Sequence, residues 1–185
     1  MMNHYNTQQI LEDIEAFKTR MKDYDGERVI YFDQDNTLCR FSVYQQVDAA
    51  LSQCYTKGFY KNLPIFQEAP EVISALQRMN LRCKILSSLL DSPFCNDEKL
   101  ESIHYYFPMI RDEDIILVPY GERKVDKVDD VKHSILVDDY HKNINDWYLS
   151  GGVAIKKSYS GKPRPVPVVS NLIELFPVLR ELNFI

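Results

Sequence analysis

The chain has no long apolar run and no excess of basic residues, and each absence excludes a class of protein. No segment approaches the roughly 20 apolar residues that cross a bilayer. The opening MMNHYNTQQILEDIEAF lacks the charged start and apolar centre of a secretory signal. The formal net charge of −5 argues against a general binder of nucleic acid or of anionic membranes, because these need a basic surface. We therefore expect a cytoplasmic protein that binds neither.

The cysteines are few and widely spaced. Cys39, Cys54, Cys83 and Cys95 include no CxxC pair and no close cluster with histidine, which argues against a structural zinc site and against a disulfide framework. Free thiols in a reducing compartment are expected. The sequence also has no internal repeat and no low-complexity tract. Its 45% hydrophobic and 26% charged residues are typical of a globular protein, and we expect one domain over residues 1–185.

Short apolar segments alternate with amphipathic patterns along the chain. Three helices are predicted. The first begins near Ile10 and ends near Gly26, and the second has Pro70 in its first turn and ends near Met79. The third runs from an N-cap at Asn96 to about Tyr106. Ser170 is the expected N-cap of a final helix. Strands are expected in the segments RVIYF, RCKILSS, DIILVP, HSILVDD and GGVAIKK.

Two helices have a predicted buried face. The first comprises Ile10, Leu11, Ile14, Phe17 and Met21, and the second comprises Val72, Ile73, Leu76 and Met79. Residues from Phe41 to about Gly58 have a mainly helical pattern, whereas SGKPRPVPVV is expected to be irregular because it contains three prolines. Apolar strands that alternate with helices indicate an α/β fold: a Rossmann-like parallel sheet with helices on both faces.

Polar residues follow three of the predicted strands. The first strand leads into Asp33 and Asp35, the second ends in Ser87 and Ser88, and the fourth ends in Asp138 and Asp139. Ligands of open parallel sheets bind beyond the carboxyl ends of the strands, so these side chains are expected to meet at one edge. Crowded carboxylates repel one another. Mg²⁺, which prefers oxygen ligands, would relieve that repulsion.

A lysine after the third strand would complete an anion site, and either Lys124 or Lys127 is suitably placed. In the DxD segment, one carboxylate would attack phosphorus, and the other would protonate the leaving group once the chain turns after Asp33. An Asx-rich turn is the simpler alternative. An EF-hand is excluded because its sixth and twelfth positions would be Leu38 and Tyr44 rather than glycine and glutamate.

These motifs together resemble those of the haloacid dehalogenase-like superfamily. The first motif is matched by Asp33-Gln34-Asp35-Asn36-Thr37, the second by Ile85-Leu86-Ser87, and the fourth by Ile135-Leu136-Val137-Asp138-Asp139. The resemblance implies that Asp33 is the nucleophile and a magnesium ligand, and that Asp35 is the general acid and base and binds the metal through its carbonyl. It also implies that Ser87, Ser88 and Lys124 hold the phosphoryl group, and that Asp138 completes the metal site with support from Asp139.

Within the superfamily, the segment from Val29 to Trp147 is most similar to the 5′(3′)-deoxyribonucleotidases. That likeness implies a small helical cap at about residues 42–68, and it implies that Phe41 packs near the base of a nucleoside monophosphate. Asn36 stands where many members have glycine. The alternative is a catalytically idle protein of the same fold that binds a ligand or partner. A receiver-like phosphoryl switch fits less well, because receivers place their acidic pair early and their acceptor aspartate on a later strand.

Overall fold

The computed structural model describes residues 7–41, 52–160 and 165–185. In chain order the elements are α1 (Thr7–Lys22), β1 (Val29–Phe32), α3 (Ala69–Arg78), β2 (Arg82–Ser88), α4 (Cys95–Tyr106), a 3-10 helix (Asp112–Asp114), β3 (Ile115–Val118), a 3-10 helix (Lys124–Lys127), β4 (Ser134–Asp138), α5 (His141–Leu149), β5 (Val153–Lys157), β6 (Val168–Val169), a 3-10 helix (Leu172–Glu174) and α6 (Leu175–Glu181). No helix among these residues is both long and apolar enough to cross a bilayer.

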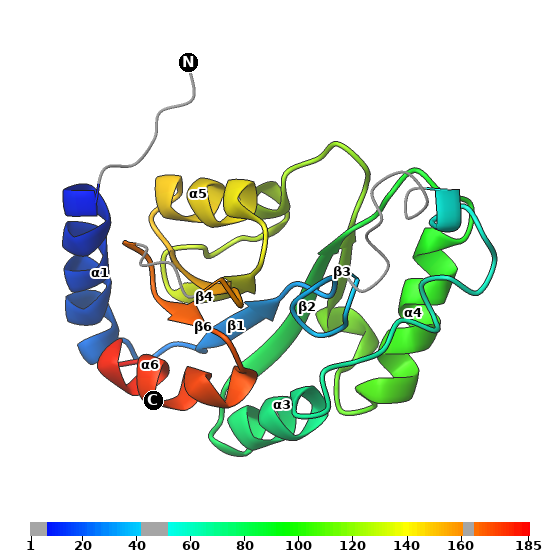
Figure 1. Cartoon of the computed structure of the whole chain (residues 1–185). Coiled ribbons are helices and arrows are strands. Elements are labelled where there is room, and N and C mark those ends of the chain that lie inside the picture. Colours follow the sequence, from blue (N-terminus) through cyan, green and yellow to red (C-terminus); the bar gives the residue numbers. More distant parts are fainter. Residues whose placement is uncertain (1–6, 42–51, 161–164) are drawn as a thin grey trace.

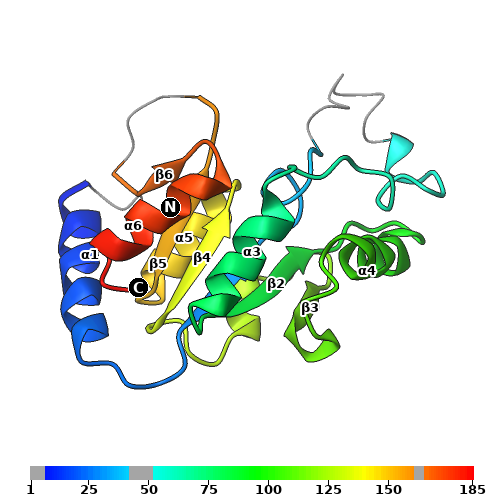
Figure 2. The same ribbon diagram turned by 90° about the horizontal axis from the view of Figure 1, so that it is seen from below.

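A parallel sheet with the order β3-β2-β1-β4-β5-β6 forms the centre of the molecule. Helix α5 covers one face, and α3 and α6 cover the other (Figures 1 and 2). All five residues of β4 are buried, as is β1 from Ile30 to Phe32. Strands buried on both faces are almost continuously apolar, which is the pattern of VIYF and SILV. The predicted α/β class and the parallel sheet with helices on both faces are therefore confirmed.

Helix α1 buries most of its predicted face. Ile10, Ile14, Phe17 and Met21 are buried at the helical spacing expected of an amphipathic helix. The placement of Leu11 in this face was wrong: its side chain is 49% exposed, because it lies one position around the helix from the buried stripe. The helix also ends earlier than expected, at Lys22 rather than near Gly26.

Helix α3 begins as predicted, with Pro70 in its first turn, where the missing N–H of proline costs no helical hydrogen bond. Val72, Ile73 and Leu76 are buried. Met79 is not part of this face and is 41% exposed. It follows the last helical residue, and its backbone has already left the helical conformation.

Both predicted N-caps were displaced, the first by two residues and the second by one. Helix α4 begins at Cys95, because the Phe94 carbonyl already accepts the Glu98 N–H at 3.1 Å, and Asn96 lies inside the helix. Near the C-terminus, Asn171 caps the 3-10 helix before α6: its side chain accepts the Ile173 N–H at 2.8 Å. The Ser170 hydroxyl donates to the Glu174 carboxylate instead, at 2.7 Å.

The structure differs from the prediction in the proline-rich segment and describes only part of the region from Phe41 to Gly58. The proline-rich segment is not wholly irregular, because Val168 and Val169 pair with the end of β5 as strand β6. Of the expected helical region from Phe41 to Gly58, residues 42–51 lie outside the described residues, and Cys54 to Gly58 form turns. The described part of this region packs against α4 in a second small hydrophobic cluster, made of Cys39, Cys54, Tyr60, Leu63 and Cys95. All four cysteines are free and buried.

Candidate active site

The sheet order brings the polar strand ends together. Strand β1 pairs with β2 on one side and with β4 on the other, so the chain turns to opposite sides of β1 at this point. Asp33 directly follows β1, and its N–H donates to the Val137 carbonyl of β4 at 2.9 Å. Asp138 is the last residue of β4, and Ser87 lies near the end of β2. This is the location at which open α/β sheets bind their ligands.

One lysine joins the first and fourth strands at this edge. The Lys124 ammonium donates to Asp33 Oδ1 at 2.5 Å and to Asp138 Oδ2 at 2.7 Å, and the Lys124 side chain is only 3% exposed. Lys127, the other candidate, is paired with Glu122 and is 36% exposed. Of the two candidates, Lys124 is the one whose ammonium lies at this edge of the sheet.

A tight turn separates the two aspartates of the DxD segment. The Gln34 carbonyl accepts the N–H groups of Leu38 and Cys39, each at 2.9 Å. Asn36 has a φ of 56°. This left-handed conformation suits glycine best and asparagine next, which explains why asparagine is acceptable where many members of the resembled superfamily have glycine. The turn carries Asp35 away from Asp33 and toward helix α4.

Asp35 meets a second buried lysine that the sequence patterns did not reveal. The Lys99 ammonium, on α4, donates to Asp35 Oδ2 at 2.8 Å, to Ser87 Oγ at 2.9 Å and to the Ser88 carbonyl at 3.0 Å. The Lys99 side chain has no exposed surface. Ser88 therefore contributes its backbone carbonyl to this network. The available signal was position on the helix, since Lys99 shares its buried face with Cys95, Ser102 and Ile103.

Three carboxylates are close enough to share a metal ion. Oxygens of Asp33, Asp138 and Asp139 all lie within 4.8 Å of one another. Asp138 is held in place by the Tyr140 N–H at 2.7 Å and by the Asn143 side chain at 2.9 Å. An all-oxygen set of this kind suits Mg²⁺. Of the expected metal ligands, Asp33 and Asp138 belong to this cluster, and Asp139 joins them. Asp35 is expected to bind the metal through its backbone carbonyl, and its carboxylate accepts from Lys99.

Burial and mutual repulsion raise the pKa values of the carboxylates at this edge. Burial raises the pKa of Asp138, and Asp33 adds to the rise while Lys124 opposes it. Burial also raises the pKa of Asp139 to about 7, with further contributions from Asp33 and Asp138. The pKa of Asp35 is raised by burial against the opposing effect of Lys99. Carboxylates that resist ionisation in this way are stabilised by a bound cation, so the residues present fit a metal ion.

The two lysines remain charged despite their burial. Burial lowers the pKa of each ammonium, but Asp138 and Asp33 outweigh this effect at Lys124, and Asp35 and Asp33 outweigh it at Lys99. The pKa of each lysine is consequently raised. Each ammonium group is paired with carboxylates at this edge, and Lys124 is the one that contacts the cluster of Asp33, Asp138 and Asp139.

Aromatic rings lie beside the turn that follows the DxD segment. Phe41 is half-buried, and its ring meets the ring of Phe59 edge to face, with centroids 5.6 Å apart. Phe59 in turn meets Tyr60 at 5.0 Å. Phe41 thus forms an aromatic pair with the segment that leads back to α3. The predicted cap at 42–68 is described only from residue 52 onward.

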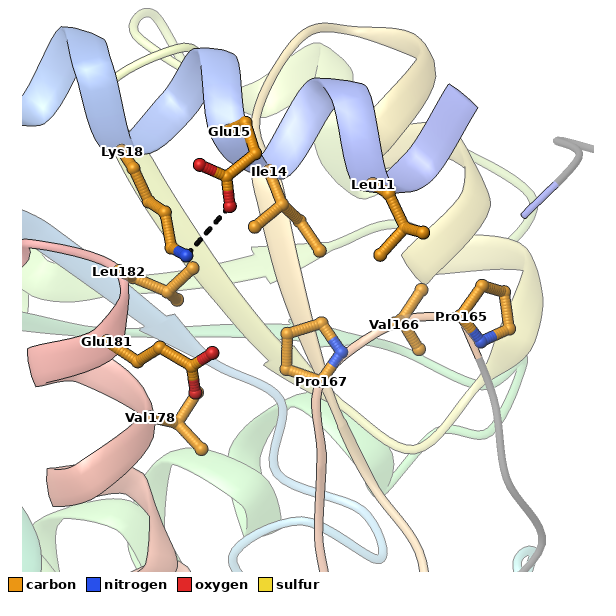
Figure 3. Close-up of a pocket in the computed structure, with 10 residues that line it drawn as sticks. All are labelled: Leu11, Ile14, Glu15, Lys18, Pro165, Val166, Pro167, Val178, Glu181 and Leu182. Carbon is orange, nitrogen blue, oxygen red and sulfur yellow. Dashed lines mark hydrogen bonds and ion pairs between the residues drawn. The ribbon is translucent and has the colours of Figure 1, made fainter. Parts of the chain in front are cut away.

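A separate pocket of about 300 Å³ lies between α1, residues 165–167 and α6 (Figure 3). Its walls are mainly apolar, with Leu11, Ile14 and Val166 facing into it, and Glu15 and Lys18 form an ion pair at its rim. None of the catalytic candidates lines this pocket. It does not belong to the site at the strand ends.

Comparison with known proteins gives a match to solved structures only. No family model and no curated protein matches the sequence. Similar structures include a dehalogenase (TM-score 0.58, 16% identity, covering 84% of this chain and 98% of that chain) and a haloacid dehalogenase-like family hydrolase from Xanthomonas campestris (0.58, 14%, 86% and 94%). A third is the D,D-heptose 1,7-bisphosphate phosphatase from B. bronchiseptica complexed with magnesium and phosphate (0.57, 12%, 83% and 99%). The chain therefore has the haloacid dehalogenase-like α/β fold.

Proposed function

We propose that the protein is a magnesium-dependent phosphomonoester hydrolase that forms a phosphorylated aspartate at Asp33. The observation that carries this proposal is the pair of contacts from Lys124 to Asp33 and Asp138. They hold a carboxylate nucleophile and a phosphate-binding ammonium together at the ligand edge of the sheet. The known activities of similar structures agree, since these include a phosphatase with magnesium and phosphate bound.

The first step transfers the phosphoryl group to the protein. A carboxylate oxygen of Asp33 attacks phosphorus, and the bond from phosphorus to the ester oxygen breaks. Asp35 gives its proton to that leaving oxygen, and an alcohol departs. Ser87 and Lys124 hold the phosphoryl oxygens while their charge develops. The raised pKa of Asp35 suits a residue that must start this step protonated.

The second step releases phosphate. Asp35, now a carboxylate, takes a proton from a water molecule as the water oxygen attacks phosphorus. The bond between phosphorus and Asp33 breaks, which restores the free carboxylate and yields inorganic phosphate. Asp33 and Asp35 act in both steps, so no further acid or base is required.

Asp33, Asp138 and Asp139 would hold the magnesium ion, together with the Asp35 carbonyl. A bound Mg²⁺ supplies charge neutralisation for the phosphoryl oxygens and for the nucleophile. Lys124 keeps Asp33 Oδ1 oriented, and Asn143 and the Tyr140 N–H keep Asp138 oriented. These bonds limit the reorganisation that the site undergoes when the substrate arrives.

The substrate we propose is a nucleoside monophosphate or a similar small phosphorylated metabolite, as in the 5′(3′)-deoxyribonucleotidases. The edge-to-face pair of Phe41 and Phe59 supports this, because aromatic rings of this kind stack on or pack against a nucleobase. We further propose that residues 42–68 form a small cap over the site. The net charge of −5 agrees with a small substrate rather than a nucleic acid.

The test is phosphate release from a panel of nucleoside monophosphates and sugar phosphates, with Mg²⁺ or with EDTA. We expect release only with Mg²⁺, and a loss of at least about 1,000-fold in Asp33→Asn, because the nucleophile is removed. Asp112→Asn is the matched control: it changes an exposed carboxylate at the start of β3, at the opposite end of the sheet, and keeps wild-type rates. No release from any member by the folded wild type would favour the idle binding protein.

A further inference from the structure

The buried ammonium of Lys99 takes no part in either proposed chemical step. It lies on α4, has no exposed surface, and is surrounded by three acceptors: Asp35 Oδ2, Ser87 Oγ and the Ser88 carbonyl, at 2.8 to 3.0 Å. An ammonium has three N–H groups, so every donor is used. A buried charge is tolerated only when it is paired and hydrogen-bonded, and the cost of burying it suggests a purpose beyond packing.

The bond to Ser87 fixes the direction of the serine hydroxyl. An ammonium can only donate, so Ser87 Oγ must accept from Lys99. The hydrogen of the Ser87 hydroxyl is then directed elsewhere and is free to be donated to a ligand. In the same way, the bond to Asp35 Oδ2 holds one oxygen of that carboxylate, and the other oxygen, Oδ1, accepts only a long contact of 3.8 Å from the Cys39 thiol and is the one that we expect to react.

Lys99 itself is held in place by its neighbour in the sequence. The Glu98 carboxylate, also buried, accepts the N–H groups of Gly58 and Tyr60, the latter at 3.0 Å. Gly58 has a φ of 92°, which favours glycine. Helix α4 is thus joined by Glu98 to the segment between β1 and α3, which we call the inserted segment, and by Lys99 to the strand ends of the candidate site. Because the helix that carries Lys99 is held at two places, the Lys99 ammonium can fix the positions of the groups that it contacts.

We propose that Lys99 is a positioning residue: it aligns Asp35 with the leaving oxygen of the substrate and Ser87 with a phosphoryl oxygen. This inference rests on the proposed function. A positioning role for Lys99 predicts a specific difference between the hydrolysis rates of two phosphate esters. Protonation of the leaving oxygen matters greatly for a basic leaving group such as phenolate, and much less for the weakly basic p-nitrophenolate. A residue that aligns the proton donor must therefore affect the two esters unequally.

The experiment compares phenyl phosphate with p-nitrophenyl phosphate, each with Mg²⁺, for the wild type and Lys99→Met. We expect kcat to fall about 100-fold for phenyl phosphate and about tenfold or less for p-nitrophenyl phosphate, with KM changed by less than about fivefold. Lys18→Met is the control. Lys18 lies on α1, away from the strand ends, and pairs with Glu15, and its loss leaves both rates unchanged.

A double variant tests whether Lys99 acts through Asp35, and it also removes the unpaired charge that would prevent folding. We expect the kcat of Asp35→Asn/Lys99→Met for phenyl phosphate to lie within about tenfold of that of Asp35→Asn, because the loss through Asp35 is not additive and only the loss through Ser87 remains. If Lys99→Met alone does not fold, this pair of variants decides the question by itself.

The outcomes separate the inference from the function on which it rests. Equal losses for both esters, or a full additional loss in the double variant, would overturn the positioning role while the phosphatase activity stands. A wild type that hydrolyses neither ester would overturn the proposed function, and the positioning role with it. Unequal losses together with non-additivity support the inference.

Discussion

Single buried residues already determine part of how this protein responds to pH. Burial raises the pKa of the Cys83 thiol from 9.0 to about 12, with a smaller contribution from Asp114. Above pH 9 the unfolded chain therefore loses this proton while the folded chain keeps it. The free energy of unfolding then falls as the pH rises from 9 toward 12, because the folded state binds more protons.

Cys83→Ser removes this group from the balance. We expect the loss of stability between about pH 8 and about pH 10.5 to be smaller in Cys83→Ser than in the wild type, as measured by urea unfolding at each pH. Tyr31, whose pKa is likewise raised to about 12 by burial, titrates in both proteins and cancels from the comparison. An identical pH dependence in the two proteins would contradict the role assigned to burial.

A second residue-scale prediction concerns the carboxylate cluster without metal. Asp139 is ionised only at a cost, since it is buried near Asp33 and Asp138. We expect Asp139→Asn to be more stable than the wild type in EDTA at about pH 8, by roughly 1–3 kcal/mol, because one of three repelling charges is gone. Thermal and urea unfolding measure the difference. Asp130→Asn, at a half-exposed ion pair with His133, serves as the control; a less stable Asp139→Asn would be evidence against repulsion.

The strand-end residues were predictable because their chemistry follows short apolar runs that are themselves recognisable. Asp33, Ser87 and Asp138 each lie at such a position. Lys99 was not predicted. A lysine inside a helix is normally solvated, and no local pattern announces that the Asp35 carboxylate, far away in the sequence, turns toward it. Only the buried face of α4 hinted at this location.

At the scale of elements, helix α4 connects the sheet to the inserted segment between β1 and α3. Glu98 provides this connection through two backbone N–H groups. Glu98→Gln leaves one acceptor oxygen instead of two and removes the charge, so a buried donor loses its partner. We expect a loss of about 1–3 kcal/mol in the free energy of unfolding.

Urea unfolding measures this loss, and hydrogen exchange of the Gly58 and Tyr60 amides locates it. Glu101→Gln is the matched control on the same helix, since its carboxylate is 62% exposed and pairs only at the surface with Lys61. We expect less than about 0.5 kcal/mol from this change. Equal losses in the free energy of unfolding would show that the buried Glu98 contacts stabilise the fold no more than the surface pair of Glu101 does.

Strands were predicted better than helix boundaries, for a physical reason. Each strand is a short apolar run bounded by polar residues, and burial on both faces enforces that pattern. Helix ends depend on which carbonyl first accepts a helical N–H, as Phe94 does ahead of the expected cap at Asn96. Strand β6 was missed because three prolines precede it in the sequence. Its two valines pair with β5 at the edge of the sheet, where nearby prolines are tolerated.

For the whole molecule, the sequence predicted parallel strands but not their order. The order β3-β2-β1-β4-β5-β6 is what brings Asp33 and Asp138 onto neighbouring strands, with Lys124 between them. Alternation of helices and strands is compatible with several orders, so it predicted one shared edge for these residues but not that their strands are neighbours. The same order concentrates carboxylates at one edge, and the stability of the entire fold should therefore respond to a metal ion.

This expectation leads to a prediction about global stability. In the proposed function Mg²⁺ binds only the folded state, so at about 100 times its dissociation constant we expect it to stabilise the fold by about 2.7 kcal/mol. For a chain of this size, that corresponds to a rise in Tm of roughly 5–10 °C. Differential scanning calorimetry with Mg²⁺, with EDTA, and with NaCl at matched ionic strength measures it. We expect Asp138→Asn to lose most of the rise.

Inorganic phosphate extends the same measurement to the anion site. Phosphate alone must approach the carboxylates of Asp33, Asp138 and Asp139, whose charge Lys124 offsets only in part, whereas a bound Mg²⁺ would offset the rest. Because coupling between two ligands is reciprocal, phosphate should raise Tm further with Mg²⁺ than with EDTA, and Mg²⁺ should bind more tightly when phosphate is present. Independent, additive shifts would mean that the two ligands occupy separate sites, and the carboxylate cluster would then not be the place where phosphate and metal meet.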